Sequence, residues 1–179
     1  TYSKDVCPFL PYLSATVDAY YNKITDKIIA YPTKNLAVWS MRNLGSVEIK
    51  GIDVTGNVSL QPCEKLRINF SGNYTYQRAL DVTNSDPASE EGRTYKHQIA
   101  YTPRVSGSGQ VGIETSWVNL SYSFLFSGKR YAVGQNIAAN RLDSYSDHSI
   151  SASRDFRIKK VTTSLSVEML NIMNKNYEI

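Results

Sequence analysis

Hydrophobic and polar residues alternate with a period of two along most of the chain. Between residues 66 and 77, apolar residues or glycine fill the even positions and polar residues fill the odd ones. The same alternation occurs in segments 13–21, 52–60, 111–117, 120–126 and 161–169. Because successive side chains of a β-strand point to opposite faces, the pattern predicts an all-β chain whose strands have one apolar and one polar face.

The connections between these segments alternate in length. Segments 61–65, 115–118 and 158–160 are short, whereas segments 32–43, 81–98 and 127–143 are long and rich in polar, aromatic and charged residues. An antiparallel meander places all the short connections at one end and all the long ones at the other. Outer-membrane barrels have this asymmetry, with short periplasmic turns and long extracellular loops. We therefore expect an antiparallel meander that forms part of a transmembrane β-barrel.

One predicted strand contains a change of phase. Val47 and Ile49 are out of phase with Ile52 and Val54, and Gly51 lies between the two pairs. A residue without Cβ tolerates the kink of a β-bulge, so the sequence predicts a bulge at Gly51.

The polar face of the predicted strands is small and neutral. Its residues include Ser121, Ser123, Ser149, Ser151, Ser153, Thr162, Ser164 and Ser166. A water-exposed face usually carries more charge, so we expect this face to line a lumen or to pack against another polar body. The apolar face is almost free of charge, as lipid contact requires. Its exception, Arg154, lies near a turn and can extend to the lipid headgroups.

Tyrosine is the most frequent aromatic residue, with 13 tyrosines against two tryptophans and five phenylalanines. Several tyrosines near the predicted strand ends fit an aromatic girdle at a membrane interface, and cross-strand packing is the alternative. These residues are Tyr20, Tyr31, Tyr76, Tyr101 and Tyr131.

Composition and charge exclude several classes of protein. The 179 residues are 41% hydrophobic and 20% charged, which excludes a disordered chain. The net charge of +4 is scattered without a long basic run, so we expect no nucleic-acid partner. No apolar stretch approaches the roughly 20 residues that a transmembrane helix needs.

The sequence offers little for catalysis or metal binding. His97 and His148 lie outside zinc-type and triad-type motifs, so we expect no enzyme, no metal site and no cofactor. Cys7 and Cys63 match no zinc or redox spacing, which leaves one disulfide or two thiols as the options.

One long connection is acidic. It contains Asp81, Asn84, Asp86, Glu90 and Glu91, whose oxygens suit Ca²⁺ but lack the EF-hand register. We therefore expect a solvated acidic loop.

Six stretches of the chain occur in an order that matches a known family. They are VDAYYNKITDKIIAYP at 17–32, NLGSVEIKGIDVTGNVSLQP at 43–62, LRINFSGNYTYQRA at 66–79, YTPR at 101–104, SGKRY at 127–131 and LNIMNKNYE at 170–178. In order and approximate spacing they resemble the late barrel strands of TonB-dependent outer-membrane receptors. The resemblance covers nearly the whole chain from Leu13 onward.

The resemblance implies that residues 1–179 are a single partial domain, the C-terminal segment of a transmembrane β-barrel without its plug and early strands. The intact protein would be a multi-pass barrel in the outer membrane of a Gram-negative bacterium. It would take up a siderophore, a vitamin or a glycan, with energy supplied by the TonB complex through the absent plug. Its expected partners are outer-membrane lipid, TonB and the ligand, and the unpaired strand edges of the fragment are expected to associate with another copy.

The resemblance implies that the ligands of this family contact the extracellular loops and the upper lumen. Aromatic and cationic residues of the long connections are therefore the ligand-binding candidates. They are Trp39, Arg42, Tyr95, His97, Arg130, Tyr131 and Arg141. The alternative role for each is packing within the loops.

A soluble, secreted β-sandwich or lipocalin-like binding module is the alternative to an outer-membrane receptor. Alternating strands are expected of both classes, and the neutral polar face and the asymmetric connections favour the receptor.

Overall fold

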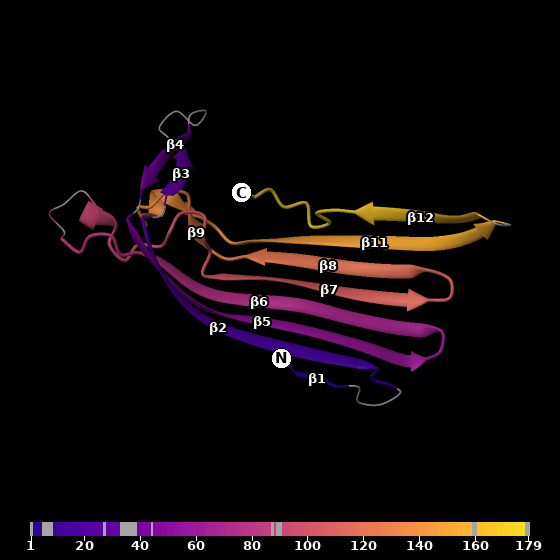
Figure 1. The fold of residues 1–179 in the computed structure, drawn as a ribbon. Helices are drawn as coiled ribbons and strands as arrows, with labels where there is room; N and C mark the ends of the chain where they lie inside the picture. Colours follow the sequence, from indigo (N-terminus) through magenta and orange to yellow (C-terminus); the bar gives the residue numbers. More distant parts are fainter. Residues whose placement is uncertain are drawn as a thin grey trace.

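The main element of the protein is one antiparallel sheet of eight strands, seen in the computed structural model of Figure 1. The structure describes residues 2–4, 9–26, 28–32, 39–43, 45–86, 88, 91–158 and 161–177. The strands of the sheet are β1 (Tyr2–Lys4), β2 (Tyr12–Thr25), β5 (Ser46–Cys63), β6 (Leu66–Asp81), β7 (Val105–Thr115), β8 (Asn119–Ser127), β11 (Tyr145–Ile158) and β12 (Val161–Met169). They follow one another in chain order, which confirms the predicted all-β antiparallel meander. The sheet is open, with β1 and β12 as its edges.

Smaller elements lie in the long connections. The hairpin of β3 (Ile28–Pro32) and β4 (Trp39–Asn43) joins β2 to β5, and the pair β9 (Arg130–Tyr131) and β10 (Arg141–Leu142) lies between β8 and β11. Two 3₁₀ turns, η1 (Glu91–Thr94) and η2 (Ala138–Asn140), complete the fold of the described residues. In this part of the chain, no helix has the length and apolar character to cross a membrane.

The two ends of the sheet are different, as the connection lengths predict. At one end, called here the turn end, β5 joins β6 and β7 joins β8 through tight turns. The β3–β4 hairpin, loop 82–104 and loop 128–144 all lie at the opposite end, called here the loop end (Figure 1). The connection from β11 to β12 contains residues 159–160, which lie outside the described residues.

The strand register places the alternating residues on two unlike faces. Apolar residues pair across the sheet, as Val58 does with Phe70 and Phe70 with Val111. Polar residues pair in the same way on the other face, where Asn57 is opposite Ser71. These sets are called the apolar face and the polar face below.

Gly51 does not lie in a bulge, contrary to the prediction from the sequence. The register of β5 with β2 and with β6 is continuous through Gly51, and the irregularity lies between Leu60 and Cys63. A Cβ atom at Gly51 would lie 2.6 Å from the hydroxyl oxygen of Tyr20 and 2.7 Å from the carbonyl oxygen of Tyr76. Glycine is therefore required because Tyr20 lies against the β5 backbone. Tyr20 also shares the polar face, so it does not belong to an aromatic girdle.

The change of phase has a different cause. Val47 and Ile49 lie on the polar face, where Val47 is fully buried against Ala79 and Ile99, and Ile49 packs against this cluster. Ile99 comes from loop 82–104, and its backbone N–H donates to the carbonyl oxygen of Ala79 at 3.1 Å. The hydrophobic core of the described residues therefore lies at the loop end, where a loop folds onto the polar face.

Substitution of Gly51 by alanine is expected to destabilise the folded protein by about 1–3 kcal/mol, because the new methyl group overpacks against Tyr20 and the β6 backbone. Gly56→Ala is the matched control, since no atom lies within 4 Å of its added Cβ. Denaturant unfolding of the full-length protein measures both variants. Equal midpoints for Gly51→Ala and Gly56→Ala would contradict the close contact.

Candidate ligand-facing site at the loop end

The polar face contains an open hollow of about 470 Å³. It crosses five strands and is lined largely by hydroxyl and amide side chains, including Thr55 and Asn57 of β5, Ser71 and Asn73 of β6, Ser108 and Gln110 of β7, Ser123 of β8, and Asp147 and Ser149 of β11. Such a surface offers hydrogen bonds without a strong net charge. It therefore suits contact with another polar body or a polar solute.

Two carboxylates of this face are incompletely paired. Asp53 of β5 and Asp147 of β11 each have one carboxylate oxygen that is buried and has no hydrogen-bond partner. An unpaired buried oxygen is costly, so we expect water or another polar group to bond to each of these oxygens.

Loops 82–104 and 128–144 dock against each other above this face. The Asn136 side chain accepts a hydrogen bond from the backbone N–H of Gln98 and donates one to the backbone carbonyl oxygen of Gln98 at 3.0 Å. The backbone N–H of Asn136 also donates to Nδ1 of His97 at 3.3 Å. A backbone bond of 2.8 Å from Tyr101 to Tyr131 adds a further connection. The two loops consequently form one unit.

Asp81 anchors loop 82–104 at the end of β6. It is only 5% exposed, and its carboxylate accepts hydrogen bonds from the hydroxyls of Thr83 at 2.6 Å and Thr94 at 2.7 Å. Its backbone carbonyl also accepts the Lys96 N–H at 2.7 Å. The expectation of a solvated acidic loop is therefore wrong for Asp81, whose carboxylate fixes the loop by binding its hydroxyls.

An aromatic and charged cluster lies beside loop 128–144. The rings of Tyr145 and Tyr177 stack with centroids 4.2 Å apart, and the Arg130 guanidinium lies 5.1 Å from the Tyr145 ring. The Tyr177 hydroxyl donates to Asp147 at 2.7 Å, and this bond raises the pKa of the Tyr177 phenol above its usual value. The chain after β12 thus returns to β11, where the Ile172 N–H also bonds to the His148 carbonyl oxygen at 2.9 Å.

A second hollow, of about 320 Å³, lies next to this cluster. Its lining includes the exposed cations Arg141 and Lys175, together with Asp143, Tyr145 and Tyr177. Arg141 forms a loose ion pair with Asp143, with 3.6 Å between Nε and Oδ1. Because an exposed ion pair of this kind contributes little stability, the Arg141 side chain remains available to a ligand.

The structure brings together five of the seven ligand candidates in the two docked loops. His97 faces Gly134 and Asn136, Tyr95 lies beneath the Lys96 ammonium, and Tyr131 pairs with Arg141 in the β9–β10 ladder. Arg130 is 4% exposed and bonds to the Asp143 carbonyl oxygen at 3.4 Å. Arg130 therefore positions Tyr145 and the loop backbone, whereas Arg141 is exposed.

Trp39 and Arg42 lie on β4 of the separate hairpin, opposite Pro32 and Ile29 in the register. Their side chains lie outside the described residues.

Four residues of the aromatic cluster and the second hollow were not among the ligand candidates selected from the sequence. They are Tyr145, Asp147, Lys175 and Tyr177. The alternation of Tyr145, Asp147 and Ser149 places all three on the polar face of β11, and this signal was available. The return of Tyr177 to Tyr145 depends on the two left-handed residues Asn171 and Asn174, both with φ of 47°. Local alternation contains no information about such a return.

Comparisons with known proteins agree with the geometry of the sheet. Residues 9–172 match the family model described as TonB dependent receptor-like, beta-barrel. Among solved structures, the ferric preacinetobactin receptor BauA from Acinetobacter baumannii is similar, with a TM-score of 0.59 and 17% sequence identity. The similarity covers 93% of this chain and 23% of the BauA chain. The search of curated proteins found no match.

Removal of the Asn136 side chain is expected to loosen the contact between the two docked loops. Asn136→Ala deletes both hydrogen bonds to the Gln98 backbone, and the lost bonds weaken the docking by about 1–3 kcal/mol. Asn140→Ala is the control. Among the contacts described, the Asn140 side chain bonds within its own loop, to the Gln135 carbonyl oxygen. Hydrogen exchange of the Gln98 amide in the full-length protein should accelerate in the first variant and not in the second.

Proposed function

Because the chain belongs to the TonB-dependent receptor β-barrel family, we propose that it forms a wall segment and ligand-facing loops of an outer-membrane receptor for active uptake. The supporting observation is the single two-faced sheet. Its apolar face is uncovered within the described chain, its polar face is hollowed, and all three long connections lie at one end. A bilayer would cover the apolar face, and a plug domain would bind to the polar face.

The membrane location is the outer membrane of a Gram-negative cell. Exposed apolar residues such as Phe70, Ile150 and Val167 lie on one face and suit contact with lipid chains. The secreted β-sandwich alternative requires a second sheet packed on this face, and the described residues form one layer there. We therefore favour the barrel.

The ligand belongs to the siderophore, vitamin or glycan class, and TonB supplies the energy through a plug domain. The docked loops present aromatic rings, amides and the cation Arg141, and the segment after β12 adds Lys175 beside the same hollow. These groups suit a bulky polar ligand with negative charge. We assign the chain no catalytic step, no cofactor and no metal. Its work is selective binding and enclosure of the transport path.

A blot of fractionated source cells with an antibody raised to this chain tests the location. The expected result is a band several times larger than 20.1 kDa in the outer-membrane fraction. A band near 20.1 kDa in a soluble fraction would instead support the secreted binding module.

The ligand role of Arg141 can be tested in the full-length receptor with the ligand that co-purifies from its source. Arg141→Ala is expected to weaken binding of an anionic ligand about tenfold, because a charged hydrogen bond is lost. Lys129→Ala is the control, since Lys129 is an exposed cation of the same loop that does not line the described hollow. Equal losses in both variants would indicate a general effect of charge rather than a site.

A further inference from the structure

Three cations gather on the apolar face at the loop end. Lys23 of β2, Lys50 of β5 and Arg78 of β6 are exposed and occupy adjacent strands. The register places Lys50 directly opposite Arg78, and Lys23 opposite Glu48, two residues from Lys50. These three side chains are called the cationic cluster below.

The cationic cluster lies at the edge of an apolar band. On β5, the residues on this face from 52 to 60 are Ile52, Val54, Gly56, Val58 and Leu60, and Lys50 is the next position toward the loops. A tilted strand needs about 9–11 residues to cross the hydrocarbon core, so the band has the length of one crossing. Tyr21 and Tyr76, which flank the cluster on this face, are 61% and 46% exposed. Tyrosines at this position are typical of the headgroup level.

Glu48 is the acidic neighbour of the cluster. Its carboxylate lies 3.1 Å from Nζ of Lys50 and accepts a hydrogen bond of 3.5 Å from the Tyr21 hydroxyl. One carboxylate against three cations leaves a surplus of positive charge beside the apolar band. Half of the Lys50 side chain remains accessible, so the ion pair does not close the cluster.

We infer that the cationic cluster binds the phosphate group of a lipid headgroup in the outer leaflet, with the lipid chains lying along the adjoining apolar band. The inference rests on the proposed function, together with the expectation that the long connections of an outer-membrane barrel are extracellular. Arg78 offers a planar fork that matches phosphate oxygens, and the two lysines offer ammonium groups. The juxtaposition of phosphate-binding groups and a lipid-facing band favours a phospholipid or phosphorylated glycolipid over a soluble anion.

The test uses the full-length receptor purified in neutral detergent, with phosphatidic acid as the probe and phosphatidylcholine as the reference lipid. Native mass spectrometry measures the affinity for each lipid. We expect the wild type to prefer phosphatidic acid, and the variant K23Q/K50Q/R78Q to lose about fivefold in this affinity for each charge removed. Lys65→Gln is the matched control, because Lys65 is an exposed cation in the turn after β5 at the opposite end.

A second variant is expected to raise the affinity for phosphatidic acid, and misfolding cannot produce such an increase. Glu48→Gln removes the carboxylate that competes with phosphate, so phosphatidic acid should bind about fivefold more tightly. Loss of affinity in the triple variant with a gain in Glu48→Gln supports the cluster. A wild type that binds both lipids equally, or a triple variant that matches Lys65→Gln, overturns it.

The two proposals fail in different ways. A receptor that is purified from the outer membrane but has no preference for phosphatidic acid overturns the lipid site alone. A native protein that stays monodisperse without detergent and binds neither lipid overturns the proposed function, and the lipid site with it.

Discussion

A single-layered antiparallel ladder is the constraint on which the rest of the structure depends. Neighbouring strands pair their backbone groups, yet the described residues place no second layer over most of the sheet's length. The buried apolar cluster of Val47, Ala79 and Ile99 is small and lies at the loop end. A sheet of this kind gains its burial from surroundings that the described chain does not supply. Under the proposed function, lipid on one face and a polar body on the other provide that burial. On that proposal, the alternation of residue types separates a lipid-facing surface from a surface that faces a polar body, rather than a protein core from water.

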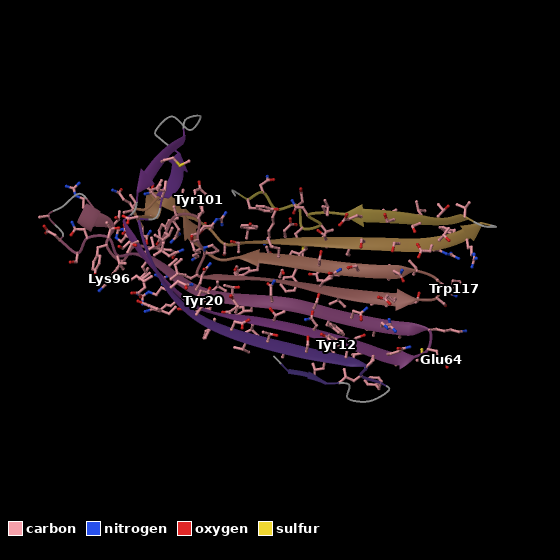
Figure 2. The ribbon with its side chains drawn as sticks, in the orientation of Figure 1. Tyr12, Tyr20, Glu64, Lys96, Tyr101 and Trp117 are labelled. Carbon is pink, nitrogen blue, oxygen red and sulfur yellow. The ribbon has the colours of Figure 1, made fainter. Side chains whose placement is uncertain are left out.

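Much of the fold could be predicted because the signals are local. Alternation fixes which residues share a face, and connection length fixes which end each loop occupies, so the meander follows without any long-range information. The error at Gly51 shows where this reasoning stops. Val47 and Ile49 break the phase because Ile99, about fifty residues later in the chain, packs against Val47. A periodicity analysis of one strand contains no signal from a loop that folds onto it. Local signals suffice for the tight connection predicted at 115–118, which is present as a turn with Trp117 exposed in it (Figure 2).

The sequence predicts which types of residue form the candidate site, but not which of those residues face a ligand. Aromatic and cationic residues of the long connections do gather at the loop end, as the resemblance implied. Composition cannot separate a cation that holds the scaffold from one that faces a ligand, however. Arg130 is buried against Tyr145 and the Asp143 backbone, whereas Arg141 is exposed beside a hollow. The difference arises because Arg130 of β9 contacts Tyr145 of β11 and the Asp143 backbone, a tertiary contact that residue type alone does not reveal.

Under the proposed function, the distribution of charge on the apolar face gives the sheet a defined depth in a bilayer. From β2 to β12, the charged residues of this face lie near its two ends, with Lys23, Glu48, Lys50 and Arg78 toward the loops and Arg154 toward the turns. The guanidinium carbon of Arg154 lies 5.0 Å from the centroid of the Phe156 ring, two residues nearer the turn end. Between these ends, each charge moved onto the face would cost about 2–4 kcal/mol at the midplane of the bilayer. That cost is large compared with the contribution of an exposed ion pair such as Lys50 with Glu48, which is at most about 1 kcal/mol. Under the proposed function, lipid therefore constrains the positions of these charges more strongly than their partners on the protein do.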